Sequence, residues 1–357
     1  MSAVVAGSYR PPLPARAVAG LLGAYKRAFA SEATATLLSR PNPVRRTGFE
    51  LQLRIDARVV EAEDVISLTL RSPSGADLPS WIPGAHIDVL LPSGRQRQYS
   101  LNGDPFDRKT YRIAVRYLAD GDGGSRELHD ELRVGDLLRI RGPRNAFTFV
   151  DAPEYLFVAG GIGITPILPM VAECARRGAP WRLIYLGRSR ASMPFLPRLE
   201  RCRGGRLEVR PDDEYGVPDL DALMAEAPRG AAVYVCGPPP LMESARRVLS
   251  ATDPTASVHT ERFSPLPVED GAPFRITLLR SGKTVDVGGD ESALAAILRV
   301  RPGTAFSCRQ GFCGTCKTRV FAGEIDHRDR SLPESERDSA MLTCVSRALG
   351  DDLVLDL

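Results

Sequence analysis

The stretch CRQGFCGTC, residues 308–316, places three cysteines within nine positions. Their spacing is C-x4-C-x2-C, and Cys344 follows as a solitary fourth cysteine. This pattern is typical of a plant-type [2Fe–2S] cluster, whose two irons and two sulfides need four converging thiolates. Gly311 and Gly314 carry no Cβ, so the backbone can approach such a cluster closely. The sequence therefore predicts four metal ligands: Cys308, Cys313, Cys316 and Cys344.

A structural zinc site is the alternative use of these cysteines. Zinc loops usually pair cysteines in two short C-x2–4-C knuckles. Here one knuckle is widened and the fourth cysteine stands alone. The spacing favours the cluster over zinc.

Composition and length limit the class of protein. The 357 residues are too many for one core and indicate two or three domains. The seven cysteines are an odd number, and four of them lie in the last fifty residues, which suits metal binding in a reducing cytoplasm better than a disulfide framework. No apolar run reaches the roughly 18 residues that cross a bilayer, and the N-terminus does not read as a secretory signal. We expect a cytoplasmic protein with no transmembrane segment and no nucleic-acid partner.

The hydrophobic pattern changes along the chain and divides it into segments. Residues 1–46 carry a basic excess and one helical apolar face, so they predict a basic N-terminal helical extension. Residues 47–150 contain short alternating runs such as VISLTL and HIDVLL, which predict an antiparallel β-barrel. Residues 151–262 alternate strands with helices, which predicts an α/β domain with a parallel sheet. A proline-rich linker over 263–273 leads to a last domain over 274–357.

CRQGFCGTCKTRV followed by LTCVS resembles the ferredoxin domain of plant-type electron-transfer proteins. Placed after two other domains, it resembles the phthalate dioxygenase reductase family over roughly residues 47–357. The resemblance implies a flavin-binding β-barrel over 47–150, an NAD-binding α/β domain over 151–262, and a β-grasp ferredoxin domain over 274–357.

RQYSL, residues 97–101, offers a guanidinium for a phosphate, a phenol for a flat ring and a hydroxyl near its edge. Alone it is a weak signal, since Arg and Tyr alternate on many surface strands. The resemblance implies that Arg97 binds the flavin phosphate and that Tyr99 and Ser100, followed by Leu101, contact the ring. A second phosphate cradle is expected where free N–H groups open a helix, at Gly123, Gly124 and Ser125. The family implies FMN, with FAD left open.

AGGIGITP (159–166) and CGPPPLM (236–242) each end a strand and open a helix. Glycines there allow a pyrophosphate to approach a helix N-terminus. The resemblance implies that Cys236 lies near the nicotinamide and that Thr165 contacts its carboxamide. Arg188 and Arg190 could meet a 2′-phosphate, yet the family favours NADH, with NADPH left open. The other expected nucleotide contacts are Gly160, Gly161, Gly163, Gly237 and Pro238.

The three expected sites belong together because a nicotinamide delivers a hydride, a cluster accepts single electrons, and a flavin can do both. We expect an NADH-dependent reductase, with Tyr99, Ser100 and Cys236 as catalytic residues and a terminal oxygenase as electron acceptor. A Rieske-type aromatic ring-hydroxylating or demethylating oxygenase is the first candidate. A cytochrome P450 or di-iron oxygenase is the second. A redox-sensing interaction protein is a third possibility, from a different class. No Rieske C-x-H spacing occurs, so the chain itself is not expected to be the oxygenase.

Overall fold

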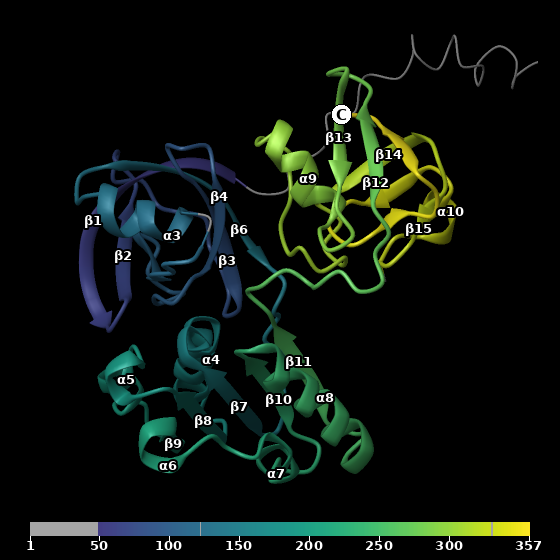
Figure 1. Cartoon of the computed structure of the whole chain (residues 1–357). Helices are drawn as coiled ribbons and strands as arrows, with labels where there is room; N and C mark the ends of the chain where they lie inside the picture. The colour runs from purple at the N-terminus through teal and green to yellow at the C-terminus, as the bar shows by residue number, and fades with distance from the viewer. Residues whose placement is uncertain (1–48, 122, 330) are drawn as a thin grey trace, which may run out of the picture. The chain divides into compact units, whose positions relative to one another are not determined.

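The computed structural model describes residues 49–121, 123–329 and 331–357 (Figure 1). The predicted basic extension, residues 1–46, lies outside the described residues. Within the described part, the helices and strands form three larger sheets and one two-stranded sheet. No helix in this part of the chain combines the length and the apolar character that a membrane crossing requires.

The first sheet has six antiparallel strands in the order β4-β3-β6-β1-β2-β5. Strand β6 begins with alternating exposed and buried residues: Leu138 and Ile140 point into the core, while Leu137 and Arg139 are exposed. A short helix, α3 (Gly124–Arg126), continues into the π-helical turn η1 (Glu127–Glu131). The strands are β1 (Phe49–Ala62), β2 (Val65–Arg71), β3 (Ala85–Leu90), β4 (Gln96–Ser100), β5 (Thr110–Arg116) and β6 (Leu137–Asn145).

The second sheet has five parallel strands in the order β11-β10-β7-β8-β9. Helices cover both of its faces, so its central strands β10, β7 and β8 are largely apolar and buried, whereas the edge strands β9 and β11 are of mixed polarity. The strands are β7 (Tyr155–Gly160), β8 (Trp181–Gly187), β9 (Gly205–Pro211), β10 (Ala232–Cys236) and β11 (Ser257–Glu261). The helices are α4 (Ile164–Arg177), α5 (Leu196–Leu199), α6 (Asp212–Tyr215), α7 (Leu220–Ala225) and α8 (Pro239–Thr252), with short 3-10 turns at η2 (Gly161–Gly163) and η3 (Arg190–Ser192).

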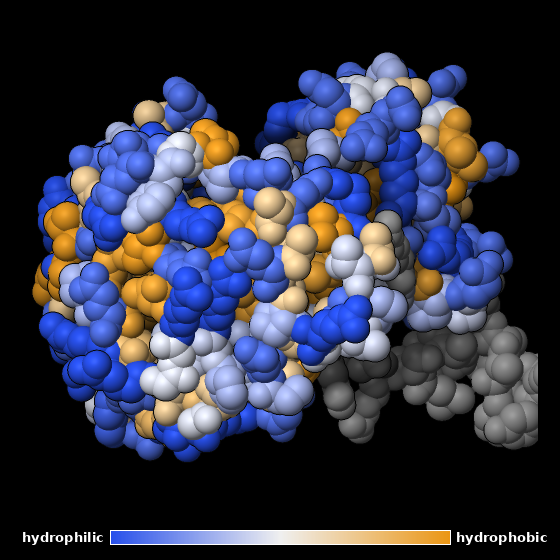
Figure 2. Space-filling model, turned by 90° about the horizontal axis from the view of Figure 1, so that it is seen from below, coloured by the Kyte–Doolittle hydropathy of each residue, from blue (hydrophilic) through white to orange (hydrophobic). Residues whose placement is uncertain are grey.

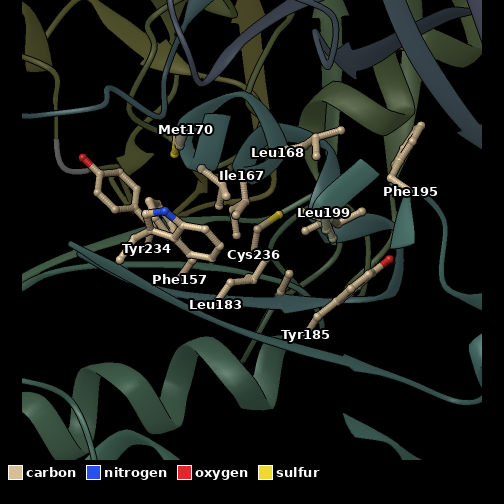
Figure 3. Packing of buried hydrophobic residues seen from close by; sticks show 14 of the residues in the cluster. Phe157, Ile167, Leu168, Met170, Leu183, Tyr185, Phe195, Leu199, Tyr234 and Cys236 are labelled. Atoms are coloured by element: carbon tan, nitrogen blue, oxygen red, sulfur yellow. The ribbon is translucent and has the colours of Figure 1, made fainter. Parts of the chain in front are cut away.

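Strand β7 shows how the sequence divides between the two faces of this sheet. Phe157 packs with Tyr234 and with Ile167 of α4, as Figure 3 shows. Leu156 points to the opposite face, where α7 and α8 supply residues such as Leu223 and Leu241. The period of two along a strand therefore builds two separate cores from one apolar run.

The third sheet has five strands in the order β13-β12-β18-β14-β16 and packs against α9. The hydroxyl of Ser292 accepts a hydrogen bond from the backbone N–H of Ala295 at 3.2 Å, which caps α9. The remaining elements are β12 (Phe274–Leu278), β13 (Lys283–Val287), α9 (Ala293–Val300), β14 (Lys317–Ala322), β15 (Ile325–Asp326), α10 (Glu334–Arg337), β16 (Ala340–Leu342), β17 (Arg347–Ala348) and β18 (Asp352–Leu355).

The segment between β11 and β12 contains no helix or strand, and two arginines anchor its C-terminal half. Arg328 donates hydrogen bonds to the carbonyl oxygens of Glu269 and Asp270. Arg347, which is 1% exposed, donates to the carbonyl oxygen of Ala272 at 2.7 Å. Backbone carbonyls that would otherwise lack partners are satisfied in this way. On the face drawn in Figure 2, apolar residues reach the surface in separate groups between hydrophilic ones.

Candidate functional site

The four predicted cysteine ligands come together as two pairs. The thiols of Cys308 and Cys313 are hydrogen-bonded to each other, and so are those of Cys316 and Cys344. In the first pair, the thiolate of Cys313 accepts the hydrogen bond, which lowers its pKa and raises that of Cys308. Cys313 is exposed, whereas Cys316 and Cys344 are buried. One pair thus faces the surface and the other faces the core.

The loop that carries the first three cysteines depends on glycine. Gly311 has a φ of +76° and Gly314 a φ of +71°, a region that side chains disfavour. A Cβ on Gly311 would also lie only 2.7 Å from Cγ2 of Val345. The turn aims backbone N–H groups at sulfur: Gln310 donates to Sγ of Cys308 at 3.4 Å. Such donors stabilise the negative charge of thiolates and sulfides.

The paired arrangement fits a binuclear cluster better than a single metal ion. Among the described residues, no group of three or more His, Cys, Asp or Glu side chains converges as a mononuclear site requires. Two pairs of thiols would supply two ligands to each of two irons. The chemistry of this donor set therefore fits [2Fe–2S].

Strand β4 carries the predicted flavin residues, and the glycine pair lies against it. A Cβ on Gly124 would lie 2.3 Å from Nε of Arg97, so any side chain there would push that guanidinium aside. A Cβ on Gly123, whose φ is +90°, would lie 3.5 Å from Nη2 of Arg95. The hydroxyl of Ser125 accepts from the backbone N–H of Leu118 at 3.1 Å. Guanidinium groups gathered over bare backbone form a cradle that suits a phosphate.

A cavity opens beside β4, and we call it the β4 cavity. Tyr99 and Ser100 line it, and so does Cys308 from the cluster loop. His86, which is 7% exposed, also lines it, and its Nε2 has no hydrogen-bond partner among the described residues. A buried, unpartnered nitrogen normally marks a place where another group binds. The cradle at Gly124 and this nitrogen together fit a flavin. The side chain of Leu101, by contrast, lies in the barrel core, fully buried.

A partly buried acid faces the same cavity. Glu261, at the end of β11, accepts a hydrogen bond from the hydroxyl of Ser100 at 3.5 Å. Burial raises the pKa of Glu261 to about 8, so its carboxyl group holds a proton at neutral pH. Cys236 is the residue opposite Glu261 in the β10–β11 pairing, and its side chain is fully buried. Burial raises the pKa of the Cys236 thiol well above its usual value. Ser100 and Cys236 therefore lie on either side of Glu261.

The two glycine loops of the parallel sheet pack directly against each other. A Cβ on Gly163 would lie 2.2 Å from the carbonyl oxygen of Cys236, and one on Gly160 would lie 2.7 Å from Cδ of Pro238. Gly237 approaches the backbone of Gly160 in the same way. The close packing of the two loops therefore requires glycine at these positions, independently of any pyrophosphate that approaches them. The hydroxyl of Thr165 donates to the carbonyl oxygen of Ile162 at 3.0 Å.

A second cavity, of about 410 Å³, lies at the carboxyl ends of this sheet, and we call it the glycine-loop cavity. Gly160, Gly161 and Pro238 line it, as parallel α/β sheets place their ligands at this edge. Arg188 and Asp212 also line it.

The two arginines that could select a 2′-phosphate are in different situations. Arg190 is held by Glu214, with Nε to Oε1 at 2.8 Å and Nη2 to Oε2 at 3.2 Å. This bidentate pair commits its guanidinium to a carboxylate. Arg188 lines the glycine-loop cavity together with the carboxylate of Asp212, which would repel a second phosphate.

Sequence reasoning missed three residues of these cavities. His86 lies in the run GAHID, Glu261 ends the run SVHTE, and Asp212 follows the strand RLEVRP. Asp212 directly follows β9, and Glu261 is the last residue of β11, two strands that the sequence pattern does not indicate. A search for polar residues at the ends of all five parallel strands would have found both of them.

Comparisons with known proteins agree with this geometry. A family model for a 2Fe-2S iron-sulfur cluster binding domain matches residues 276–349, and one for an oxidoreductase FAD-binding domain matches residues 52–149. Phenoxybenzoate dioxygenase subunit beta of Ectopseudomonas oleovorans is 40% identical over 314 residues, which are 86% of this chain and 97% of that protein.

Two solved structures extend the comparison. Phthalate dioxygenase reductase matches with a TM-score of 0.67 and 34% identity, over 86% of this chain and 98% of that one. An intact type IV self-sufficient cytochrome P450 monooxygenase matches with a TM-score of 0.66 and 42% identity, over 93% of this chain. This chain spans 44% of that monooxygenase.

The fold and the matched domains define an oxidoreductase that combines a flavin domain with a [2Fe–2S] ferredoxin domain. The chain belongs to the phthalate dioxygenase reductase family. The predicted fold class, the resemblance and the cofactor classes are thereby confirmed.

Proposed function

We propose that this chain is the NADH-dependent reductase of an oxygenase system and passes single electrons to a Rieske-type terminal oxygenase. One observation carries the proposal. Residues of the flavin strand, Tyr99 and Ser100, line one cavity together with Cys308 of the cluster loop. A bound flavin supplies the exchange between two-electron hydride chemistry and the one-electron chemistry of a cluster. The chain's own residues set the orientation, charge and solvent access of each group.

Each site residue has a distinct role in this proposal. Arg97 would bind the flavin phosphate above the bare backbone of Gly124, with Gly123 and Ser125 completing the cradle. Tyr99 and Ser100 would orient the ring in the β4 cavity. Glu261 holds a proton beside Ser100 and keeps a negative charge away from an electron-rich ring. The cluster ligands would be the two thiol pairs: Cys308 with Cys313, and Cys316 with Cys344.

The nucleotide is bound in the glycine-loop cavity, and NADH is the preferred form. The loops at Gly160, Gly161, Gly163, Gly237 and Pro238 would hold the pyrophosphate, because bare backbone at a helix N-terminus favours negative charge. Asp212 lines the cavity, and a carboxylate there accepts hydrogen bonds from ribose hydroxyls but repels a 2′-phosphate. Arg190, one of the two cations that could have bound that phosphate, is already paired with Glu214.

The flavin that suits this barrel is FMN. The charge at the cradle is concentrated, since guanidinium atoms of Arg95, Arg97 and Arg126 all lie within 4 Å of positions that a Cβ on Gly123 or Gly124 would occupy. A terminal phosphate monoester is a compact dianion that matches such a concentration. We also place the protein in the cytoplasm, because thiolate ligands persist in a reducing compartment.

The test follows electrons through the purified holoprotein. We expect NADH to bleach the flavin absorbance and then to produce the paramagnetic signal of a reduced [2Fe–2S] cluster at low temperature. Mass analysis of the extracted flavin should give FMN, and NADPH should reduce the flavin far more slowly than NADH. A protein that binds flavin but shows neither bleaching nor a cluster signal with NADH would refute the proposal and favour a redox-sensing role.

A cytochrome P450 is a second candidate acceptor. The 42% identity to a self-sufficient P450 monooxygenase, which exceeds the 34% identity to phthalate dioxygenase reductase, favours it. Substrate turnover driven by NADH, measured with a Rieske oxygenase and with a P450 supplied separately, would decide between the two acceptors. Coupled turnover with the P450 alone would overturn the first choice.

A further inference from the structure

Two glutamines of β4 join the flavin strand to the residues just before Cys308. Nε2 of Gln96 donates a hydrogen bond to the carbonyl oxygen of Phe306 at 3.0 Å, in a buried position. Nε2 of Gln98 donates to the hydroxyl oxygen of Ser307 at 2.9 Å. These glutamines alternate along the strand with Arg97 and Tyr99. The same five-residue strand therefore serves the flavin and holds the cluster loop.

The amide of Gln98 is fixed by a buried ion pair behind it. Its Nε2 also donates to Oδ1 of Asp88 at 2.8 Å. Asp88 is 1% exposed and pairs through its other oxygen with the guanidinium of Arg144. A carboxylate held by a guanidinium only accepts hydrogen bonds, so it selects the nitrogen end of the amide. The second N–H of that nitrogen is then left to bond Ser307.

A third amide completes the contact from the side of the cluster loop. Nε2 of Gln310 donates to the carbonyl oxygen of Arg262 at 3.0 Å, just after β11. These three hydrogen bonds to residues 306–310 and from Gln310 are made by neutral amides. Neutral donors hold their partners regardless of salt concentration and of the charge that the cluster gains on reduction.

The linker between β11 and β12 makes a different set of contacts. Arg328 and Arg347 tie residues 269–272 to the ferredoxin domain itself, so that part of the linker belongs with the domain it leads into. The glutamine contacts, by contrast, join the cluster loop directly to the other two domains.

We propose that Gln98, oriented by Asp88 and Arg144, and Gln96 are positioning residues that set the rate of electron transfer from the flavin to the cluster. The inference rests on the proposed function. Electron transfer slows steeply as donor and acceptor separate, so fixing the cluster loop against the flavin strand fixes that rate. A site held loosely by about an ångström loses much of its efficiency.

The experiment compares Gln98→Met and Ser307→Ala, singly and together, with Gln52→Met, a control at an exposed glutamine of β1. In stopped-flow mixing with NADH, we expect flavin bleaching to keep its wild-type rate. We expect the following reduction of the cluster to slow roughly fivefold to tenfold, as the loss of one or two net hydrogen bonds implies. The double variant should be no slower than Gln98→Met, since both changes remove the same contact. Gln52→Met should match the wild type.

A second readout does not depend on turnover. Hydrogen exchange of the amides in residues 303–310 should quicken in Gln98→Met and Ser307→Ala, while the cluster's paramagnetic signal and reduction potential stay unchanged. Unchanged cluster reduction and unchanged exchange would overturn the inference, as would an equal slowing of flavin bleaching. If the wild type were not reduced by NADH, the proposed function would fail, and the exchange measurement would still decide whether these residues position the loop.

Discussion

The packing of the two glycine loops makes a sharp prediction for Gly163→Ala. Gly163 has a φ of −61°, which alanine adopts freely, so backbone strain is not the issue. The new Cβ would lie 2.2 Å from the carbonyl oxygen of Cys236 and 3.1 Å from the backbone nitrogen of Gly237. The first distance is more than about 1 Å inside ordinary van der Waals contact. Because both partners are backbone atoms, no side chain can turn away to relieve the overlap.

The size of the effect depends on which segment moves to remove the overlap. Either the start of α4 or the segment after β10 has to move, and these are the two segments expected to hold the nucleotide. Overpacking of this kind costs about 1–3 kcal/mol. If that cost appears as misplaced loops, kcat/KM for NADH should fall roughly tenfold to a hundredfold, since about 1.4 kcal/mol corresponds to a factor of ten.

The assay is the rate of flavin reduction against NADH concentration, together with thermal unfolding. Gly178→Ala is the matched control, because Gly178 ends α4 with a φ of +67° and no atom lies near its would-be Cβ. That variant should lose about 1–2 kcal/mol of stability through left-handed strain alone and keep its NADH kinetics. Wild-type kinetics and an unchanged melting temperature in Gly163→Ala would refute the packing argument.

Three further predictions follow from the cavities. Asp212→Ala should raise the ratio of kcat/KM for NADPH to kcat/KM for NADH roughly fivefold to thirtyfold. The repulsion between one partly screened carboxylate and a phosphate is worth about 1–2 kcal/mol. An unchanged ratio in steady-state kinetics would contradict this role of Asp212. Arg97→Met should weaken flavin binding roughly tenfold or more, since it removes a charged hydrogen bond, and a fluorescence titration of the stripped protein measures this. Glu261 has its pKa raised from 4.5 to about 8, so the flavin-free protein should lose stability as pH rises through that interval, where only the unfolded chain is ionised. Glu261→Gln should melt higher than the wild type at pH 8 and equally at pH 5, and a constant difference across this range would contradict the assignment.

The elements with the strongest local patterns were predictable. The runs VISLTL and HIDVLL alternate apolar and polar residues, and they became β2 and β3, although both faces of these strands are largely buried. The buried run EYLFVAGG became β7, and Ser292 marked the start of α9. Strand β9 was missed because GRLEVRP carries more charged residues than apolar ones. This segment is a strand because it pairs with β8, and a local sequence pattern does not reveal a pairing partner that is distant in the chain.

The sequence by itself determined the kind of protein this is. The cysteine spacing, the glycine-rich turns and the order of strands and helices are local properties, because each depends on residues that are neighbours in the chain. They indicated a barrel, a parallel α/β domain and a [2Fe–2S] site, and the family resemblance that they carry added the flavin and the nucleotide.

The contacts between the flavin, nucleotide and cluster sites could be seen only in the tertiary structure. Ser100 and Glu261 are separated by 161 residues, and Gln98 and Ser307 by 209, yet each pair is in hydrogen-bonding contact. Packing brought Cys236 against Gly163 and tied Arg190 to Glu214. Such contacts arise from the burial of whole faces of sheets and helices, so no short stretch of sequence carries them.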